Sequence, residues 1–237
     1  MVPAESDLLP RAFFARPSTD VAPDLLGCVF WSASPAGLVA VRLVEVEAYE
    51  GERDPASHAY RGQTTRNEVM FGPPGHAYVY FTYGMHYCVN LVCQPPGQAS
   101  AVLLRAGEVI EGAELAAARR SGPARRGAES GSGPRGSRQS PGLAPLRVRD
   151  LARGPGRLCQ ALGIDRSLNG TDVCAPGAAL GISPPRAAVA ADQIRTGPRV
   201  GISRAADWPL RFWLAADGHV SSYKGNGMVG GRGTTAR

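Results

Sequence analysis

The residue types best suited to chemistry lie close together in one short segment, residues 42–49. Two glutamates, Glu45 and Glu47, are followed there by Tyr49. Successive side chains of a β-strand point to opposite faces, so both carboxylates and the tyrosine would share one face of a strand. A carboxylate in such a position can take a proton from water or stabilise a developing positive charge. The segment alone still favours a simpler interpretation, ordinary acids on a half-exposed sheet face, because neighbouring like charges need partners or solvent.

A second group of candidate residues is the tyrosine-rich segment 78–87. Apolar runs flank Gly84, which suits a tight turn, so we predict a β-hairpin with its turn near residues 82–85. Tyr83 and Met85 would then lie at or beside an exposed tip. Exposed apolar groups of this kind indicate a partner, and one such partner is a DNA base stack entered by an apolar wedge. The segment equally allows a turn that folds back, with Tyr83 packed on the domain.

The elements that must position these residues follow from the apolar periodicity. Strands are expected at about 27–31, 38–49, 76–81, 87–93 and 100–105, and helices at about 111–120 and 151–162. Residues 50–76 form a long polar loop that carries His58, Arg66 and Asn67, and long loops are usually functional or disordered. Residues 121–147 consist mainly of Gly, Pro, Ser, Arg and Ala, which predicts a disordered insert. We therefore expect a single domain over residues 1–222 and a flexible glycine-rich tail at 223–237.

Composition limits the class of protein. The net charge is +6 over 237 residues, which favours polyanionic partners. Nearly all of the positive charge comes from arginine, since Lys224 is the only lysine. The absence of a signal pattern, of any apolar run near ~20 residues and of a C-x-x-C pair predicts a cytoplasmic protein without membrane contact. No metal-ligand spacing occurs, so we expect no metal or other cofactor, and we expect a monomer. The odd set of cysteines indicates reduced, buried thiols: Cys28, Cys88, Cys93, Cys159 and Cys174.

Taken in order, these segments resemble the alkyladenine (3-methyladenine) DNA glycosylase family, in its bacterial form. The matching motifs are residues 44–49, Asp54-Pro55-Ala56-Ser57-His58, Arg66-Asn67, residues 70–75, residues 78–85, Asn90, Leu103-Leu104-Arg105-Ala106, residues 154–162 and Arg199-Val200-Gly201. The resemblance covers roughly residues 20–120 and 148–222. It implies a mixed α/β (α+β) single domain around a curved, mainly antiparallel sheet, with a protruding hairpin that enters the DNA minor groove.

The resemblance also implies roles for individual residues. Glu47 matches the catalytic carboxylate that activates water, and Arg105 matches an arginine that helps to hold this water. Tyr83 matches the residue that fills the gap in the base stack, with Met85 beside it. The residues that match the pocket for the flipped base are Tyr49, His58, Tyr80, Asn90 and Val200, the last through its backbone carbonyl.

The chemistry of these residue types supports the same roles. A base must leave the duplex before its glycosidic bond can be reached. Aromatic walls then provide stacking and, for an alkylated purine cation, a cation–π attraction. Cleavage passes through an oxocarbenium-like sugar, which an ionised Glu47 kept charged by Arg105 would stabilise. Candidates for contacts to the DNA backbone are the arginines Arg66, Arg153, Arg157 and Arg199.

We therefore predict a monofunctional DNA glycosylase that starts base excision repair on double-stranded DNA with a damaged purine. The expected substrates are 3-methyladenine and 7-methylguanine, with hypoxanthine and ethenoadenine as further candidates. Strand-nicking glycosylases form a Schiff base with an amine, and here the single lysine, Lys224, lies in the tail. Two other classes stay open: an inactive nucleic-acid-binding module of the same fold and a hydrolase of free nucleosides. The pair Glu47 and Arg105 argues against the first, and Tyr83 with Met85 argues against the second.

Overall fold

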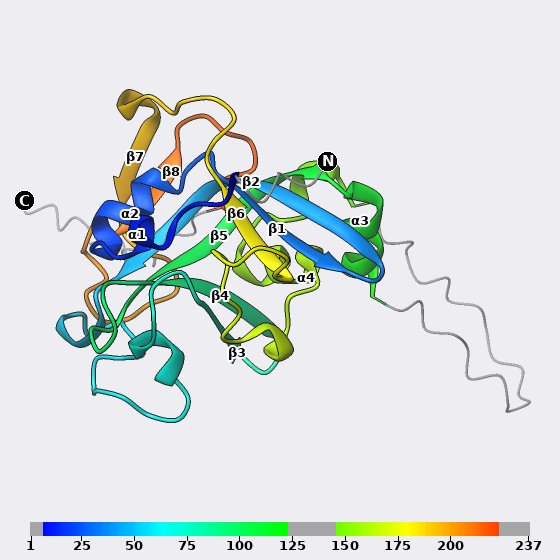
Figure 1. The fold of residues 1–237 in the computed structure, drawn as a ribbon. Helices are drawn as coiled ribbons and strands as arrows, with labels where there is room; N and C mark the ends of the chain where they lie inside the picture. Colours follow the sequence, from blue (N-terminus) through cyan, green and yellow to red (C-terminus); the bar gives the residue numbers. More distant parts are fainter. Residues whose placement is uncertain (1–6, 123–145, 223–237) are drawn as a thin grey trace, which may run out of the picture.

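The computed structural model describes residues 7–122 and 146–222, which form one α+β domain around an antiparallel sheet (Figure 1). The strands run in the order β3-β4-β5-β2-β1-β6, and β7 and β8 branch from this path. This arrangement confirms the predicted fold class. The strands are β1 (Val29–Ser34), β2 (Gly37–Tyr49), β3 (Ala77–Thr82), β4 (His86–Cys93), β5 (Ser100–Glu111), β6 (Leu180–Ser183), β7 (Ile194–Gly197) and β8 (Arg211–Leu214).

Few helices accompany the sheet. Figure 1 shows that α1 and α2 lie at the opposite end of the sheet from α3 and α4. No helix in the described parts of the chain is long and apolar enough to cross a membrane. The helices are α1 (Arg11–Phe14), α2 (Ser18–Asp24), α3 (Ala113–Ser121) and α4 (Pro155–Leu162), with short 3-10 turns at η2 (Gly51–Arg53), η3 (Glu68–Phe71), η4 (Val148–Asp150), η5 (Arg166–Leu168) and η6 (Ala191–Gln193).

Strand β2 is the central strand of the sheet and is enclosed on both edges. One edge pairs with β5 over residues 40–49. The other edge is divided between two strands, since β1 pairs with residues 37–42 and β8 pairs with residues 45–47. Glu45 and Glu47 are fully buried on this strand, where Val200 and Ser221 contact their carboxylates. The interpretation of these glutamates as ordinary acids on a half-exposed face is wrong.

The pairing of β2 with β5 is irregular next to the two glutamates. Leu43 lies opposite Gly107, Glu45 opposite Ala106 and Val46 opposite Leu104. This register leaves Val44 on β2 and Arg105 on β5 without a direct partner across the ladder. Such bulges bend a strand and redirect a side chain. Here the bulge accompanies an Arg105 guanidinium that reaches both carboxylates.

Helix α4 closes the main hydrophobic core over β4 and β5. Pro155 occupies its first turn, where a missing N–H costs nothing, and Gly163 ends the helix with a φ of 68°. Its inner face buries Leu158 and Leu162. Burial of a leucine side chain contributes roughly 1.5–3 kcal/mol each, so this short helix is held by packing more than by its own propensity.

The long loop between β2 and β3 is ordered. Besides η2 and η3, it is held together by the Asn67 side chain, whose amide donates to the His58 carbonyl over 2.9 Å and to the Gly62 carbonyl over 3.1 Å. The Asn67 carbonyl oxygen also accepts the backbone N–H of Thr64 over 2.6 Å. These three bonds keep His58 in place beside the sheet.

Some element boundaries differ from those predicted. Strand β5 runs to Glu111, so the helix expected at 111–120 begins only at Ala113, after Gly112 with a φ of 73°. Likewise, α4 begins at Pro155 and not near 151. Ser121, taken as the start of the insert, is the last residue of α3. Residues 123–145 of the predicted insert and the predicted tail at 223–237 lie outside the described residues.

All of the cysteines are free thiols, and four of them are buried. Burial, assisted by the charge of Asp24, raises the pKa of the Cys28 thiol to about 12. Burial likewise raises the pKa of the partly exposed Cys174 to about 11. Thiols of this kind are poor nucleophiles at neutral pH, as expected for packing residues.

Gly51 provides a test of how tightly the loop after β2 is packed. Its φ is +64°, and a Cβ would lie 1.8 Å from the Ala99 carbonyl oxygen. We expect Gly51→Ala to lower the free energy of unfolding by at least about 2 kcal/mol, from left-handed strain plus a backbone clash. The matched control is Gly97→Ala, which has a similar φ of +87° and no atom within 4 Å, and should cost only about 1 kcal/mol. Equal midpoints for both variants in urea unfolding would contradict the close contact.

Candidate active site

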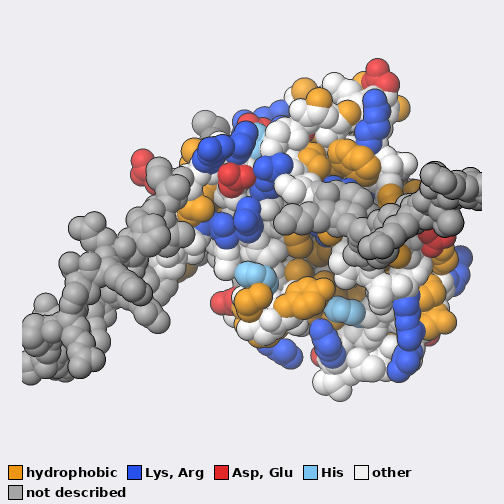
Figure 2. All heavy atoms as spheres, turned by 180° about the vertical axis from the view of Figure 1, so that it is seen from behind, with side chains coloured by type: hydrophobic (Ala, Val, Ile, Leu, Met, Phe, Trp, Pro, Cys, Tyr) orange, Lys and Arg blue, Asp and Glu red, His pale blue; other side chains and the backbone are white. Residues whose placement is uncertain are grey.

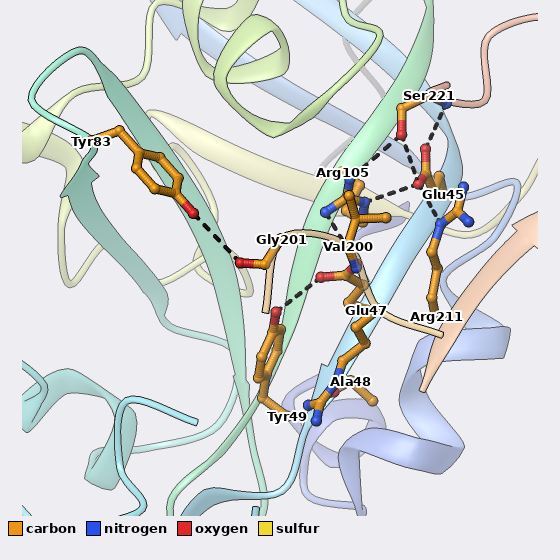
Figure 3. Close-up of polar contacts among 11 residues, drawn as sticks. Glu45, Glu47, Ala48, Tyr49, Tyr83, Arg105, Val200, Gly201, Arg211 and Ser221 are labelled. Carbon is orange, nitrogen blue, oxygen red and sulfur yellow. Dashed lines mark hydrogen bonds and ion pairs between the residues drawn. The ribbon is translucent and has the colours of Figure 1, made fainter. Parts of the chain in front are cut away.

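Glu47 lies near the end of β2 and is held from three sides (Figure 3). Its Oε1 accepts the backbone N–H of Val200 over 2.7 Å and lies 3.1 Å from Nη1 of Arg105. Its Oε2 accepts the Tyr49 hydroxyl over 2.9 Å. A buried carboxylate needs partners of this kind to stay ionised. Oε2 has a single neutral donor, which leaves it the more available oxygen.

Glu45 forms a second set of contacts directly beside the first. Its Oε1 accepts Nε of Arg105 over 2.9 Å and Nε of Arg211 over 2.7 Å. Ser221 adds its backbone N–H to Oε2 over 2.7 Å and its hydroxyl to Oε1 over 2.9 Å. Burial by itself would raise the pKa of Glu45, but Arg105, Arg211 and the Ser221 N–H outweigh it and lower that pKa below its ordinary value. Burial opposes the charge of Arg105 too, yet the two glutamates raise its pKa.

A cavity of about 180 Å³ opens in front of this pair of carboxylates. Glu47 does not reach its wall directly, because Tyr49, Arg105 and Val200 stand between. The cavity brings together every residue predicted for the base pocket: Tyr49, His58, Tyr80, Asn90 and Val200. The lining also includes Met70, Tyr78 and Pro155, for which no such role was predicted.

Aromatic side chains form one wall of the cavity. The rings of Tyr78 and Tyr80 stack with centroids 5.4 Å apart, and His58 meets Tyr80 edge-on at 4.5 Å. Nδ1 of His58 lies 3.1 Å from the Tyr78 hydroxyl. Burial and the nearby Arg66 lower the pKa of His58 below its ordinary value, which favours the neutral form of the ring. A neutral ring can stack against a cationic base without repelling it.

A larger hollow of about 640 Å³ lies elsewhere, lined in part by Arg42, Glu108 and Asp217. None of the described residues that line it is aromatic, and Arg42 is already paired with both carboxylates, 2.8 Å from Glu108 and 2.7 Å from Asp217. This hollow therefore lacks the stacking surface that a nucleobase requires. Within residues 7–122 and 146–222, no cluster of His, Cys, Asp and Glu is arranged to hold a metal ion.

The hairpin of β3 and β4 presents its tip to solvent. Tyr83 is 77% exposed and Met85 is 67% exposed, so the tip does not fold back onto the domain. The Tyr83 hydroxyl reaches the Gly201 carbonyl over 3.5 Å (Figure 3). Tyr83 also has a φ of 50°, an uncommon conformation for a side-chain-bearing residue. Phe81 is exposed as well and was missed, although strand alternation places it opposite Tyr80.

The four arginines predicted to contact the DNA backbone occupy different environments. Arg66 and Arg157 are exposed. Arg153 is half-buried and donates through Nε to the Val220 carbonyl over 2.7 Å. Figure 2 shows arginine and hydrophobic side chains side by side on one face of the molecule.

Arg199 does not fit the expected contact with a DNA phosphate. It is buried, it forms a bidentate ion pair with Asp54, and it donates to the Ala48 carbonyl over 3.0 Å. Its guanidinium also lies 4.6 Å from the centroid of the Tyr49 ring. Arg199 therefore fixes the segment that carries Val200, and a bidentate buried pair is the strong form of this interaction.

Three residues that hold the site were not singled out from the sequence: Arg211, Ser221 and Asp54. Arg211 stands inside an apolar run that reads simply as a strand, and Ser221 lies beside the glycine-rich end. Asp54 did carry a signal, since it begins the motif that ends at His58. Their partners lie 145 to 176 residues away along the chain, so local spacing does not reveal the pairing.

Comparison with known proteins agrees with this geometry. The family model described as methylpurine-DNA glycosylase matches residues 12–218. A protein of Streptomyces avermitilis, provisionally named a 3-methyladenine DNA glycosylase, is 52% identical over 217 residues, which is 91% of this chain and 92% of that protein. Proteins of the same provisional name from Frankia casuarinae and Methanocella arvoryzae are 48% and 45% identical, over 88% and 89% of this chain and 90% and 92% of their own lengths.

These matches confirm the resemblance and the predicted class of enzyme. A DNA glycosylase is a hydrolase of N-glycosyl bonds that removes damaged bases in DNA repair, and it binds damaged DNA. The buried glutamates, the aromatic cavity and the exposed hairpin all fall inside the matched range. The chain belongs to the methylpurine-DNA glycosylase family.

Proposed function

We propose that the protein flips an alkylated purine out of duplex DNA into the aromatic cavity and hydrolyses its N-glycosidic bond with a water activated by Glu47. The observation that carries this proposal is a buried carboxylate directly behind a cavity walled by aromatic rings. Glu47 and Arg105 act on the water, while Tyr49, His58, Tyr80 and the rest of the pocket hold the base.

The reaction balances without a cofactor. The water oxygen bonds to C1′ of the sugar, its proton goes to Oε2 of Glu47, and the electron pair of the broken bond leaves with the purine. The ionised carboxylate also stabilises the oxocarbenium character that develops on the sugar. Because Oε2 accepts only the Tyr49 hydroxyl, it can accept a hydrogen bond from water as well. Asn90 on the cavity floor and the backbone of Val200 offer polar groups that can orient the base.

Substrate choice follows from charge and stacking. A purine alkylated at a ring nitrogen carries a positive charge, which gains a cation–π attraction of roughly 0.5–2 kcal/mol from the rings. It is also a good leaving group, since it departs as a neutral base. We therefore propose 3-methyladenine and 7-methylguanine as the main substrates. Hypoxanthine and ethenoadenine also fit an aromatic pocket, but hypoxanthine needs protonation before it leaves.

The hairpin tip is suited to fill the gap that the flipped base leaves. Tyr83 and Met85 are the most exposed large apolar residues in the described part of the chain. Apolar side chains inserted from the minor groove unstack a base step at a cost of a few kcal/mol, which an already weakened damaged pair reduces. Because the described pocket and hairpin belong to one chain, the protein can act as a monomer.

A basic hollow beside the pocket is suited to the damaged strand. Its volume is about 440 Å³, and it shares Ser57 and His58 with the base cavity. Its lining includes three arginines, Arg61, Arg66 and Arg204, and no acidic residue among the described ones. Phosphates next to a flipped nucleotide would find complementary charge there, which extends the predicted role of Arg66 to its neighbours.

Glu47→Gln should abolish base release while leaving DNA binding intact. Glutamine can still accept the Val200 N–H through its carbonyl oxygen, but the amide NH₂ that replaces Oε2 can neither accept the Tyr49 hydroxyl nor take a proton. Single-turnover release should therefore fall by at least about 10³-fold. The measurement is release of 3-methyladenine or 7-methylguanine from duplex oligonucleotides, together with the dissociation constant. Glu114→Gln, at an exposed position of helix α3, is the matched control. Wild-type rates in Glu47→Gln would exclude Glu47 as the base, and wild-type protein that binds without release would indicate an inactive module.

The three arginines of the basic hollow should each contribute to the salt dependence of binding. Replacing Arg61, Arg66 or Arg204 with Gln should lower the slope of log K against log salt by about 1, because one phosphate contact is lost. Arg195→Gln, an exposed arginine on β7 outside this hollow, serves as the control and should leave the slope unchanged. Slopes that match the wild type in all three variants would remove the hollow from the DNA interface.

The enzyme should leave an abasic site and not a nicked strand. A lyase step requires an amine that forms a Schiff base, and the chain has a single lysine, Lys224, outside the described residues. Borohydride should therefore trap no covalent protein–DNA adduct beyond the level seen with Lys224→Arg. A stoichiometric adduct that disappears in Lys224→Arg would show that the tail lysine takes part.

A further inference from the structure

Glu45 is as deeply buried as Glu47, and neither glutamate is part of the cavity lining. The two differ in their contacts, since Glu47 contacts Tyr49 and Val200 of the lining, whereas Arg105, Arg211 and Ser221 occupy both oxygens of Glu45 at 2.7–2.9 Å. With its oxygens occupied in this way, Glu45 has no path to substrate. Keeping a carboxylate in such a place is costly unless it serves other groups.

Arg105 connects the two glutamates through different nitrogens (Figure 3). Nε binds Glu45 at 2.9 Å, and Nη1 binds Glu47 at 3.1 Å. A guanidinium is a rigid plane, so fixing Nε fixes the direction of Nη1. Without Glu45, the most favourable partner of Arg105 would be a two-point fork onto Glu47, as arginine commonly forms with a carboxylate. That fork would occupy Oε2, the oxygen that the water needs.

Charge balance gives Glu45 a second effect on the same group. Two buried guanidiniums, Arg105 and Arg211, balance the charges of Glu45 and Glu47, while the third cation near Glu47, Arg199, is balanced by Asp54. Removing the charge of Glu45 would leave two cations next to Glu47 in a medium that screens them poorly. A carboxylate surrounded by excess positive charge holds its own charge more firmly and becomes a weaker base.

We propose that Glu45 is a positioning residue: it holds Arg105 in a single-point contact with Glu47 and balances Arg211, so that Glu47 stays free to take the proton from water. This inference rests on the proposed role of Glu47 as the base. In this arrangement, Arg211 and Ser221 hold Glu45 in place, and Glu45 holds Arg105.

Glu45→Gln tests the inference through its pH profile as well as its rate. Single-turnover release of a cationic purine, 7-methylguanine or 3-methyladenine, should slow by roughly 10- to 100-fold, as for a misplaced catalytic group. The acidic limb of the profile should move to lower pH by about one unit, because a negative charge beside Glu47 has been removed. A cationic leaving group needs no protonation, so this limb reports on the enzyme.

The double variant Glu45→Gln/Arg211→Gln provides the rescue. It removes one charge of each sign, so the acidic limb should return toward its wild-type position although the fold is no more stable than in the single variant. The control for lost stability is Ile182→Ala, which changes a buried core residue on β6 remote from the site. Below its unfolding temperature, this variant should change neither the acidic limb of the pH profile nor the rate of base release. If Glu45→Gln does not fold, the milder Ser221→Ala carries the test, because it removes one hydrogen bond from Glu45 and should give a smaller shift in the same direction.

The outcomes separate this inference from the proposed function. Loss of activity in Glu47→Gln together with an unchanged rate and limb in Glu45→Gln would overturn the positioning role alone. A limb that moves to higher pH, or one that the double variant does not restore, would also overturn it. Retained activity in Glu47→Gln would instead refute the proposed base.

Discussion

The arrangement of Arg105 between two buried glutamates is the constraint on which the rest of the site depends. Burying ionised carboxylates costs several kcal/mol each unless opposite charges and hydrogen bonds replace the lost water. The compensating groups come from distant segments of the chain, since Val200, Arg211 and Ser221 all donate hydrogen bonds to Glu45 or Glu47 on β2. The C-terminal part of the described chain therefore serves the site directly, and the site forms only when the whole domain has folded.

The irregular pairing of β2 with β5 is the backbone counterpart of this ion pair. In a regular ladder, Arg105 would stand directly opposite a residue of β2, and its side chain would follow the strict alternation of the sheet. The bulge removes that partner at the level of Glu45. Strand β8 then pairs with the edge that β1 leaves open, and it brings Arg211 to Glu45. A local loss of regular hydrogen bonding is thus coupled to a gain in buried charge pairing.

Local sequence pattern was sufficient for some of these features and not for others. Alternation correctly places Glu45, Glu47 and Tyr49 on one face, and the apolar runs around Gly84 correctly predict the hairpin. The burial of the glutamates was missed on the segment alone, because it depends on β8, more than 160 residues away. Arg66 and Arg199 looked equivalent as arginines near motifs, yet one is exposed and the other is paired with Asp54. Periodicity reports the face of a strand but not the partner that covers it.

Residues 199–201 contact both the buried carboxylate Glu47 and the exposed hairpin tip. Val200 holds Glu47 through its N–H, and the next residue, Gly201, accepts the Tyr83 hydroxyl. Arg199 anchors this segment to Asp54 and to the Ala48 carbonyl, which are both buried contacts, whereas the contact of Tyr83 is exposed and long. The Tyr83 hydroxyl can therefore leave Gly201 at little cost when the tip meets DNA, whereas the buried contacts of Arg199 hold Val200, and with it Glu47, in place. Residues 199–201 thus combine a firm attachment to the catalytic carboxylate with a weak one to the hairpin tip.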